Sequence, residues 1–325
     1  MIFYSPKHIE HKPEKEIDKG IFVKNSDTPQ RIEEIAEILV KNDYSIQNAK
    51  EFDESFLYLV HDKDYVEWIR KRSKITPPDQ EYFPEVFGYD RLFDTGTPVT
   101  WNSYESALYS VFTALTAAEH IVCGNMFSYA LCRPPGHHAS KNIGGGYCYF
   151  NNAAIAAKYI QKNHEGNIAI LDLDFHHGNG TQDIFYEDPS VLYVSLHGTP
   201  EIYFPWIEGF ASEIGEGKGK GYNLNIPLDP DTGIEEYLKL LITGIKKINE
   251  FSPDCLIISL GLDIVEGDMQ GGMNIKTEDY KKIGAVIKEL DYPLLIVQEG
   301  GYDGKKNGEA VINLFDGLEI KRRFL

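Results

Sequence analysis

The alternation of short apolar runs with helical segments constrains the fold of this chain most. Buried strands are expected at residues 127–132, 168–173, 191–196, 222–228, 255–260 and 293–297. Helical periodicity marks residues 103–122, 151–162, 234–249, 277–290 and 308–318. Parallel strands need crossover connections, which helices usually supply. The sequence therefore predicts an α/β fold with a mostly parallel central sheet and helices on both of its faces.

A single domain is expected over residues 1–325, because no linker rich in Pro, Gly or Ser divides this alternation. One stretch interrupts the periodic pattern. Residues 75–98 contain prolines at positions 77, 78, 84 and 98 and show little periodicity. This stretch is predicted to be an insertion loop outside the core.

Charge limits the kinds of partner that this chain can have. It contains 50 Asp and Glu residues against 32 Lys and Arg residues, which gives a net charge of −18. A nucleic-acid partner is not expected, because phosphate binding needs clustered cations. An acidic surface instead favours a cationic small molecule or a lysine-bearing peptide, whose local concentration it raises.

Cysteine usage and the absence of long apolar runs indicate the compartment. The four cysteines, Cys123, Cys132, Cys148 and Cys255, are far apart and form no C-x-x-C pair. We expect them to be small core residues in a reducing compartment. The N-terminal residues contain no apolar stretch of signal-peptide length, and no run of about 18 apolar residues occurs. A cytoplasmic protein without a membrane partner is therefore expected.

Polar residues gather at the ends of the predicted strands and directly after them. They are His137, His138, Asp172, Asp174, His176, His177, Ser195, His197, Asp263, Glu299 and Tyr302. In an open α/β sheet, ligands bind at the carboxyl ends of the strands. The sequence therefore predicts a functional site at that edge, built from five separate segments.

A metal site is the first chemistry that these residues suggest. The sequence D-L-D-F-H puts Asp174 and His176 within reach of one ion, and Asp263 could supply a third ligand. Three protein ligands leave the open coordination position that a catalytic zinc ion requires. A capping aspartate and a core histidine are the alternative for either segment alone. A dinuclear site would want carboxylates where Gly178 and Gly261 stand, so a single catalytic ion is expected.

Acid–base and oxyanion chemistry are suggested by two further motifs. In R-P-P-G-H-H-A, His137 and His138 follow a stiff turn, and imidazoles beside a metal-activated water can carry its proton to a leaving amine. A surface or core histidine pair is the alternative. Tyr302, on the two-glycine bend of E-G-G-Y, could donate to a carbonyl oxygen as it becomes tetrahedral. Alone, it would be only a turn tyrosine.

The order of these motifs carries a family resemblance. The chain contains R-P-P-G-H-H-A, G-G-G-Y-C-Y-F-N-N, D-L-D-F-H-H-G-N-G-T-Q-D-I-F-Y, S-L-H-G, G-L-D and E-G-G-Y in this order. It resembles the histone deacetylase and acetylpolyamine amidohydrolase family, which has the arginase/deacetylase fold. The match runs from about residue 103 to residue 318, and the bacterial acetylpolyamine amidohydrolases are the members it resembles most.

The resemblance assigns roles to the site residues. It implies one Zn²⁺ or Fe²⁺ ion held by Asp174, His176 and Asp263. It also implies that His138 is the general base and acid and that His137 is a supporting electrostatic histidine. Asp172 would orient His137, and Asn179 would stand behind His138. Many members have aspartate in place of Asn179, and this departure leaves the pKa of His138 open.

The resemblance also implies how a substrate is held. Tyr147 and Phe204, together with Gly146, would line a narrow slot for an aliphatic amine chain. Glu105 and Asp94 lie where acetylpolyamine amidohydrolases place acidic groups that attract a polycation, and solvated surface charge is the alternative. The stretch at residues 77–97 resembles the insertion with which these enzymes dimerise and narrow the mouth of the site. A homodimer is therefore implied.

Two structural potassium sites are implied as well. The first would use Asp172, Asp174, His176, Ser195 and Leu196. The second would use Phe185, Asp188, Val191 and Tyr222.

The expected function is a metal-dependent amidohydrolase that removes acetyl or other short acyl groups from N-acylated amines. Acetylpolyamines are the preferred substrates because of the acidic charge and the insertion. Tyr302 favours true deacetylase activity, since some subfamilies have histidine there. Three alternatives remain: a deacylase of acyl-lysine in proteins, a non-catalytic binder of acylated amines, and a dinuclear ureohydrolase of the arginase type with two Mn²⁺ ions. The intact histidine pair and Tyr302 oppose the binder.

Overall fold

Eight strands form one parallel sheet in the computed structural model, which describes residues 1–85 and 91–322. The strand order is β4–β1–β5–β10–β9–β6–β7–β8, and every strand pair in this sheet is parallel. The strands are β1 (Ile2–Tyr4), β4 (Ile46–Asn48), β5 (Phe127–Leu131), β6 (Ile168–Asp172), β7 (Val191–Gly198), β8 (Asn223–Leu228), β9 (Cys255–Leu260) and β10 (Leu294–Gln298). The expected α/β fold with a parallel central sheet is confirmed.

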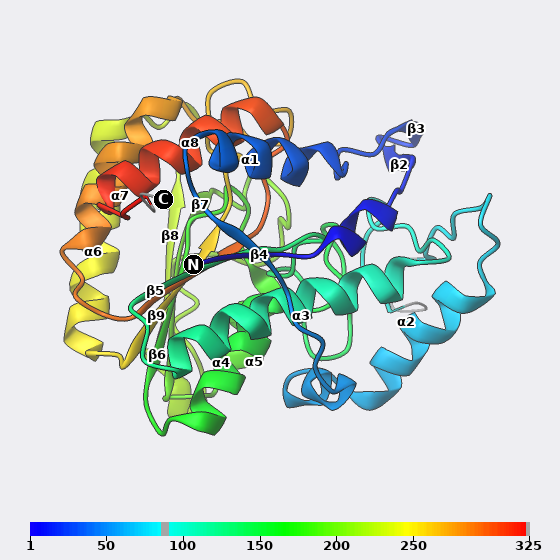
Figure 1. The fold of residues 1–325 in the computed structure, drawn as a ribbon, viewed down its shortest axis with the longest axis horizontal. Coiled ribbons are helices and arrows are strands. Elements are labelled where there is room, and N and C mark those ends of the chain that lie inside the picture. The colour runs from blue at the N-terminus through cyan, green and yellow to red at the C-terminus, as the bar shows by residue number, and fades with distance from the viewer. Residues whose placement is uncertain (86–90, 323–325) are drawn as a thin grey trace.

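Helices cover both faces of this sheet (Figure 1). One face carries α1 (Gln30–Lys41), α6 (Ile234–Phe251), α7 (Tyr280–Lys288) and α8 (Gly304–Gly317). The other carries α3 (Ser103–Val122), α4 (Asn152–Asn163) and α5 (Asn179–Phe185). Helix α2 (Lys63–Ile75) lies beyond α3, far from the sheet.

The core consists of two hydrophobic layers, one on each face of the sheet. Side chains of successive strand residues point to opposite faces, so a buried strand serves both layers. In β6, Ile168 and Ile170 belong to the layer with α3 and α4, whereas Ala169 and Leu171 belong to the layer with α6 and α8. This arrangement explains why the strands are continuous apolar runs in the sequence.

Most expected elements are present with small shifts at their ends. Residues 255–260 and 103–122 form a strand and a helix with the expected bounds. The expected helix at 277–290 is a 3-10 turn, Thr277–Asp279, followed by α7. The strands β1 and β4 were not anticipated, because three residues show too little alternation to detect. Helices α1 and α2 were also missed.

The hairpin near the N-terminus and the predicted insertion lie together at one end of the molecule (Figure 1). The hairpin of β2 (Lys15–Asp18) and β3 (Ile21–Lys24) is antiparallel and separate from the main sheet. The Ile17 N–H donates to the Thr95 carbonyl, and the Thr95 hydroxyl donates to the Ile17 carbonyl, which brings the insertion against this hairpin. Part of the predicted insertion, residues 86–90, falls outside the described residues.

Two expectations from composition can be compared with the structure. Cys132, Cys148 and Cys255 are buried, as expected, but Cys123 is exposed after the end of α3, so its prediction as a core residue was wrong. Among the described residues, we find no helix with the length and apolar character that a membrane span needs.

Candidate active site

Three side chains that could hold a metal ion meet beyond the carboxyl ends of the strands. Asp174 and His176 follow β6, and Asp263 follows β9, the neighbouring strand. The ligand atoms of all three lie within 4.8 Å of one another. Nδ1 of His176 is 3.1 Å from Oδ2 of Asp263 and 3.3 Å from Oδ1 of Asp174. We call this group the carboxylate–histidine cluster.

The electrostatics of this cluster indicate a surplus of negative charge. Burial and the neighbouring Asp174 carboxylate raise the pKa of Asp263 to about 7. Burial would lower the pKa of His176, but hydrogen bonds to Asp174 and Asp263 outweigh burial and raise it to about 9. Two buried carboxylates thus compete for one imidazolium. A divalent cation would balance both at once.

Two glycines limit the number of carboxylates in this region. A side chain at Gly261 would begin 2.2 Å from Oδ2 of Asp174, and one at Gly178 would begin 2.3 Å from Oδ2 of Asp172. These are the positions where a dinuclear site would need further ligands. The packing leaves no room for them, which agrees with the expectation of a single ion.

The histidine pair lies beside this cluster in the loop after β5. The ring centroids of His137 and His138 are 4.1 Å apart, and both side chains are buried. Nδ1 of His137 is 3.1 Å from Oδ2 of Asp172, at the end of β6. Nδ1 of His138 is 2.7 Å from Oδ1 of Asn179, at the start of α5. Each histidine therefore contacts the partner that the family resemblance implied.

These environments shift the pKa values of the two imidazoles in opposite directions. Burial would lower the pKa of His137, but the carboxylates of Asp174 and Asp172 outweigh burial and raise it to about 10. Burial, and then the nearby His137 and His176, lower the pKa of His138 well below its usual value. His138 is therefore a neutral imidazole, and its bond to Asn179 places the ring proton on Nδ1. Nε2 is left free to accept a proton.

Tyr302 follows β10 and stands two residues after Gly300, whose N–H donates to Asp174 at 2.8 Å. Its ring lies 4.6 Å from the guanidinium carbon of Arg31, and its backbone N–H donates to Asp268 at 2.6 Å. Burial raises the pKa of Tyr302 well above its usual value, although Arg31 acts against this. The hydroxyl therefore keeps its proton and is available as a hydrogen-bond donor.

Aromatic side chains line the approach to these groups. The Phe204 ring lies 4.9 Å from the His138 ring and stacks on Phe93 at 5.7 Å. The Tyr147 ring lies 5.6 Å from the Tyr302 ring. Trp206 extends this group outward, with its ring 5.2 Å from Phe204, and is exposed. Tyr147 and Phe204 therefore lie beside the expected catalytic residues, as a slot for an aliphatic chain requires.

Gly146 lets residues 144–148, which we call the glycine loop, approach His138. Its φ is +56°, a conformation that favours glycine, and an added Cβ would lie 2.2 Å from Cδ2 of His138. The Asp94 carboxylate accepts a hydrogen bond from the Gly146 N–H and another from Gly96 N–H at 2.9 Å. Asp94 therefore fixes the position of this loop, a structural role that the sequence did not suggest.

Glu105 lies away from these contacts. It belongs to the first turn of α3 and forms an ion pair with Lys7, with 3.1 Å between the charged atoms. Its side chain is 47% exposed. Glu105 is thus partly solvated and already paired with a cation, Lys7.

Two buried residues of this region, Glu16 and Arg31, were missed in the sequence, and a third, Glu299, was noted only as a polar residue after a strand, without a role. Glu16 is 6% exposed, in β2, and within the described residues its Oε2 has no hydrogen-bond partner. Arg31, in α1, donates to the backbone carbonyls of Gly301 and Glu299 and so holds the E-G-G-Y bend. Glu299 accepts hydrogen bonds from the backbone of the histidine loop. Only Glu299 carried a signal, as a polar residue directly after a strand.

The residues expected to bind potassium form two backbone regions. Asp172, at the end of β6, is the register partner of Ser195 within β7, next to Leu196. The second set lies at the turn from α5 into β7, where Asp188 N–H donates to the Phe185 carbonyl. Tyr222 joins this region through its carbonyl, which accepts from Tyr193 N–H. Both potassium sites stay predictions.

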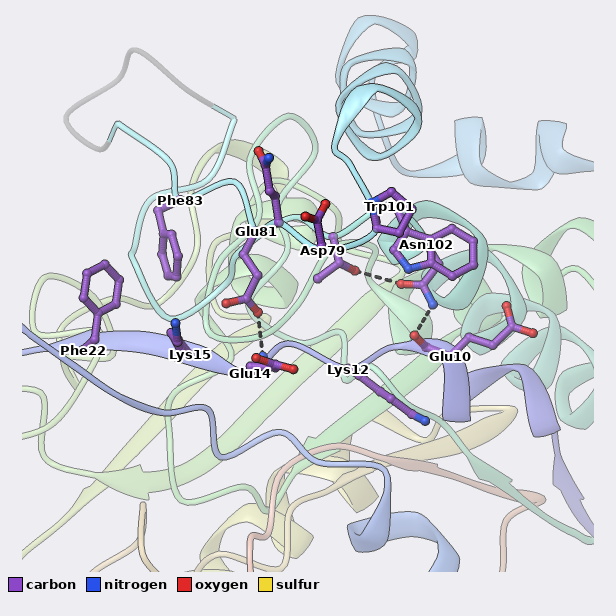
Figure 2. A pocket seen from close by; sticks show the side chains of 13 residues that line it. Glu10, Lys12, Glu14, Lys15, Phe22, Asp79, Glu81, Phe83, Trp101 and Asn102 are labelled. Atoms are coloured by element: carbon purple, nitrogen blue, oxygen red, sulfur yellow. Dashed lines mark hydrogen bonds between the residues drawn. The ribbon is translucent and has the colours of Figure 1, made fainter.

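A separate hollow lies on the outer surface between the hairpin and the insertion (Figure 2). Its volume is about 630 Å³. Acidic side chains, two lysines and the exposed Trp101 surround it. The charged lining residues are Glu10, Lys12, Glu14, Lys15, Asp79 and Glu81. None of the cluster residues or catalytic candidates lines this hollow.

Comparison with known proteins agrees with this geometry. The family model for the histone deacetylase domain matches residues 25–318. The chain belongs to the histone deacetylase family. Among its relatives, acetylpolyamine amidohydrolase 2 of Pseudomonas aeruginosa is 39% identical over 259 residues, covering 80% of this chain and 74% of the relative. Histone deacetylase 9 of Homo sapiens is 38% identical over 240 residues, covering 68% of this chain and 23% of the relative.

A solved structure supports the same family and fold. The crystal structure of acetylpolyamine aminohydrolase from Burkholderia pseudomallei superposes with a TM-score of 0.93 at 31% identity and covers 98% of each chain. The family resemblance expected from the motifs is confirmed, as is the arginase/deacetylase fold.

Proposed function

We propose that this deacetylase family member is a metal-dependent amidohydrolase that removes acetyl or short acyl groups from N-acylated amines, with acetylpolyamines as the preferred substrates. The observation that carries the proposal is that three groups of side chains with complementary chemistry lie at the same edge of the sheet. The histidine pair, with its opposite pKa shifts, lies beside the carboxylate–histidine cluster, and the bend that carries the protonated Tyr302 contacts Asp174 through the Gly300 N–H.

The residues of the cluster suit a zinc or iron(II) ion. Two carboxylates and one imidazole are acceptable ligands for either metal and leave a coordination position open. The surplus of negative charge at Asp174 and Asp263 favours a divalent cation. When bound, such an ion polarises an amide carbonyl and lowers the pKa of water.

The remaining steps belong to residues of the chain. Nε2 of His138 takes a proton from the attacking water and returns it to the nitrogen of the leaving amine. Asn179 keeps the His138 ring in the required tautomer through the bond to Nδ1. The hydroxyl of Tyr302 donates to the carbonyl oxygen as negative charge develops on it. His137, held by Asp172, adds positive charge next to that oxygen.

Glu16 supports a substrate with a second, cationic amine. A methyl group placed on Gly96 would lie 3.5 Å from the Tyr147 ring. It would also lie 3.6 Å from Oδ1 of Asp94 and 3.8 Å from Oε2 of Glu16. A buried carboxylate therefore lies one aromatic ring away from Tyr302. An ammonium group carried on a short aliphatic chain would satisfy the unpaired oxygen of Glu16.

A protein acyl-lysine deacylase is the second candidate. The similarity to histone deacetylase 9 favours it, because the identity to that protein, 38% over 240 residues, is close to the identity to acetylpolyamine amidohydrolase 2, 39% over 259 residues. The two candidates differ in what the mouth of the site admits. Relative turnover of N-acetylputrescine and an acetyl-lysine peptide tests them, and much faster peptide turnover would contradict the polyamine proposal.

We further propose a homodimer formed through the insertion at residues 75–98. Supporting observations are the exposed aromatic rings of Phe22 and Trp101 beside the insertion. Light scattering coupled to gel filtration should give about twice the mass of the chain for the wild type. The variant Trp101→Lys should shift the mass toward that of one chain, and a monomeric wild type would contradict this proposal.

A further inference from the structure

A second group of metal-ligating side chains lies behind the histidine pair. His137 of the loop after β5, Cys148 of the glycine loop and Glu299 after β10 each offer a ligand atom, and these atoms lie within 4.8 Å of one another. All three residues are buried. The proposed mechanism uses His137 but neither Cys148 nor Glu299. We call this group the thiol cluster.

The carboxylate of Glu299 is an independent sign that this group is short of a cation. Its Oε2 accepts hydrogen bonds from the N–H of Gly136 at 2.7 Å and of His137 at 3.2 Å. Its Oε1 is buried and finds no hydrogen-bond partner in the part of the chain that the structure describes. The whole residue is 0% exposed. A buried carboxylate oxygen without a partner is costly unless a proton or a cation satisfies it.

The donor set determines which cation is suitable. Thiolate and imidazole ligands prefer borderline or soft ions such as Zn²⁺ and Cd²⁺, whereas Mg²⁺ and Ca²⁺ prefer sites made of oxygen atoms alone. Burial raises the pKa of the Cys148 thiol well above its usual value, so the free thiol keeps its proton. Its Sγ lies 3.3 Å from the Gly146 carbonyl oxygen, to which it donates. Only an ion with high affinity for sulfur can displace that proton.

We propose that His137, Cys148 and Glu299 form a second cation site, which binds a thiophilic divalent ion such as Zn²⁺ or Cd²⁺. Binding forms bonds from the ion to the Cys148 sulfur, a His137 ring nitrogen and a Glu299 oxygen. The S–H bond of Cys148 breaks, and its proton, with the second ring proton of His137, passes to solvent. No electron transfer is involved.

An ion in the thiol cluster inhibits deacylation, a consequence that rests on the proposed function. It occupies a ring nitrogen of His137 and places positive charge beside the carboxylate–histidine cluster, because Nε2 of His137 is only 3.7 Å from Oδ1 of Asp174. Excess Zn²⁺ therefore lowers turnover through Cys148, beyond the one equivalent that the carboxylate–histidine cluster requires.

Cadmium titration tests the site without any need for turnover. The protein is loaded with one equivalent of Zn²⁺ in a Cys123→Ser background, which removes the exposed thiol. Cd²⁺ is then added while the ultraviolet charge-transfer band of a sulfur–cadmium bond is followed. The band should rise to saturation at one equivalent of Cd²⁺. It should disappear in Cys148→Ser and persist in Cys132→Ser, the matched buried cysteine outside the cluster.

Further variants make the outcome decisive. Glu299→Gln should weaken the apparent Cd²⁺ affinity at least tenfold, and Cys148→Ala replaces the serine variant if the serine disturbs folding. Absence of the band in the parent protein, or its survival in both Cys148 variants, would overturn the site. In turnover assays, Cys148→Ser should raise the inhibitory Zn²⁺ concentration at least tenfold, and an unchanged value would overturn the inhibition. A protein that forms the band but hydrolyses no amide would contradict the proposed function and leave the second cation site supported.

Discussion

At the scale of single residues, the site depends on groups whose surroundings fix one protonation state. His138 is neutral and Tyr302 keeps its proton, so one accepts and the other donates. The strand-end pattern predicted that these residues meet at one edge of the sheet, and the family resemblance implied their roles. Glu16 could not be predicted in this way. It belongs to a short hairpin strand whose other residues are largely exposed, and only tertiary packing buries it near the site.

Glu16→Gln should reduce the preference for a cationic substrate. The change removes the buried charge next to Tyr147 while keeping nearly the same shape. We expect kcat/KM for N-acetylputrescine to fall about tenfold, equivalent to about 1.4 kcal/mol. The value for the neutral analogue N-butylacetamide should change little. Steady-state kinetics on both substrates measures the ratio. Asp18→Asn, an exposed acid on the same strand, is the control, and an equal loss on both substrates would argue against a charge effect.

At the scale of elements, loops after strands do the positioning, and their precision comes from contacts that a sequence does not show. The glycine loop with Gly146 is held by Asp94, which was expected to bind substrate. The histidine loop is held by Glu299 and by His61, which comes from a distant segment. The sequence motifs predicted that these two loops contribute to the site, but long-range hydrogen bonds decide where the loops lie.

Gly146→Ala should misplace the catalytic histidine without unfolding the protein. The new methyl group would overlap the His138 ring, as the 2.2 Å separation shows. We expect kcat to fall by about 10²-fold, since small misplacements of catalytic groups cost that much. The matched control is Gly124→Ala, which has the same left-handed backbone, with φ of +89°, but no atom within 4 Å of the added methyl. Equal activity loss in both variants would refute the steric explanation.

His61 should stabilise the histidine loop only while it is neutral. Its Nδ1–H donates to the Ser140 carbonyl at 2.9 Å, and its Nε2 accepts from Asn151 N–H at 2.9 Å. Burial lowers its pKa to about 4. Because the folded pKa lies below the unfolded value near 6.5, this contribution is complete above pH 6.5 and is lost as the pH falls toward 4.

The test is the free energy of unfolding of His61→Gln relative to the wild type. We expect the difference between the two proteins to shrink by about 2 kcal/mol from pH 7 to pH 5. Urea unfolding in the same metal-free buffer measures it. The exposed His164 provides a control variant, His164→Gln. A His61 difference that stays constant with pH would contradict the neutral-histidine account.

At the scale of the whole molecule, the parallel sheet was predictable because its strands are buried on both faces and therefore continuous in the sequence. The family followed from the same strand ends. The helices on both faces of the sheet were also predictable, but the strands β1 and β4 near one edge were not. Their three residues gain strand structure only from pairing with β5 and with each other.

Metal loading should stabilise the whole fold. An ion that binds only the folded state adds about 4 kcal/mol at a concentration 1,000 times its Kd. We therefore expect Zn²⁺ to raise the Tm of the chelator-treated protein by several degrees. Asp263→Asn, which removes one ligand and one negative charge, should abolish most of this rise. Differential scanning calorimetry measures both, and a full rise in the variant would argue against Asp263 as a ligand.

The most direct test of the central claim is turnover of N-acetylputrescine by the Zn²⁺-loaded protein, followed by mass spectrometry beside acetylated cadaverine, spermidine and acetyl-lysine peptides. Tyr302→Phe, which removes only the donor hydroxyl, is the matched control. The account predicts polyamine turnover faster than peptide turnover and a loss of about 10²-fold or more in the variant. Peptide-only turnover would contradict the substrate assignment, and undiminished turnover by Tyr302→Phe would contradict the mechanism.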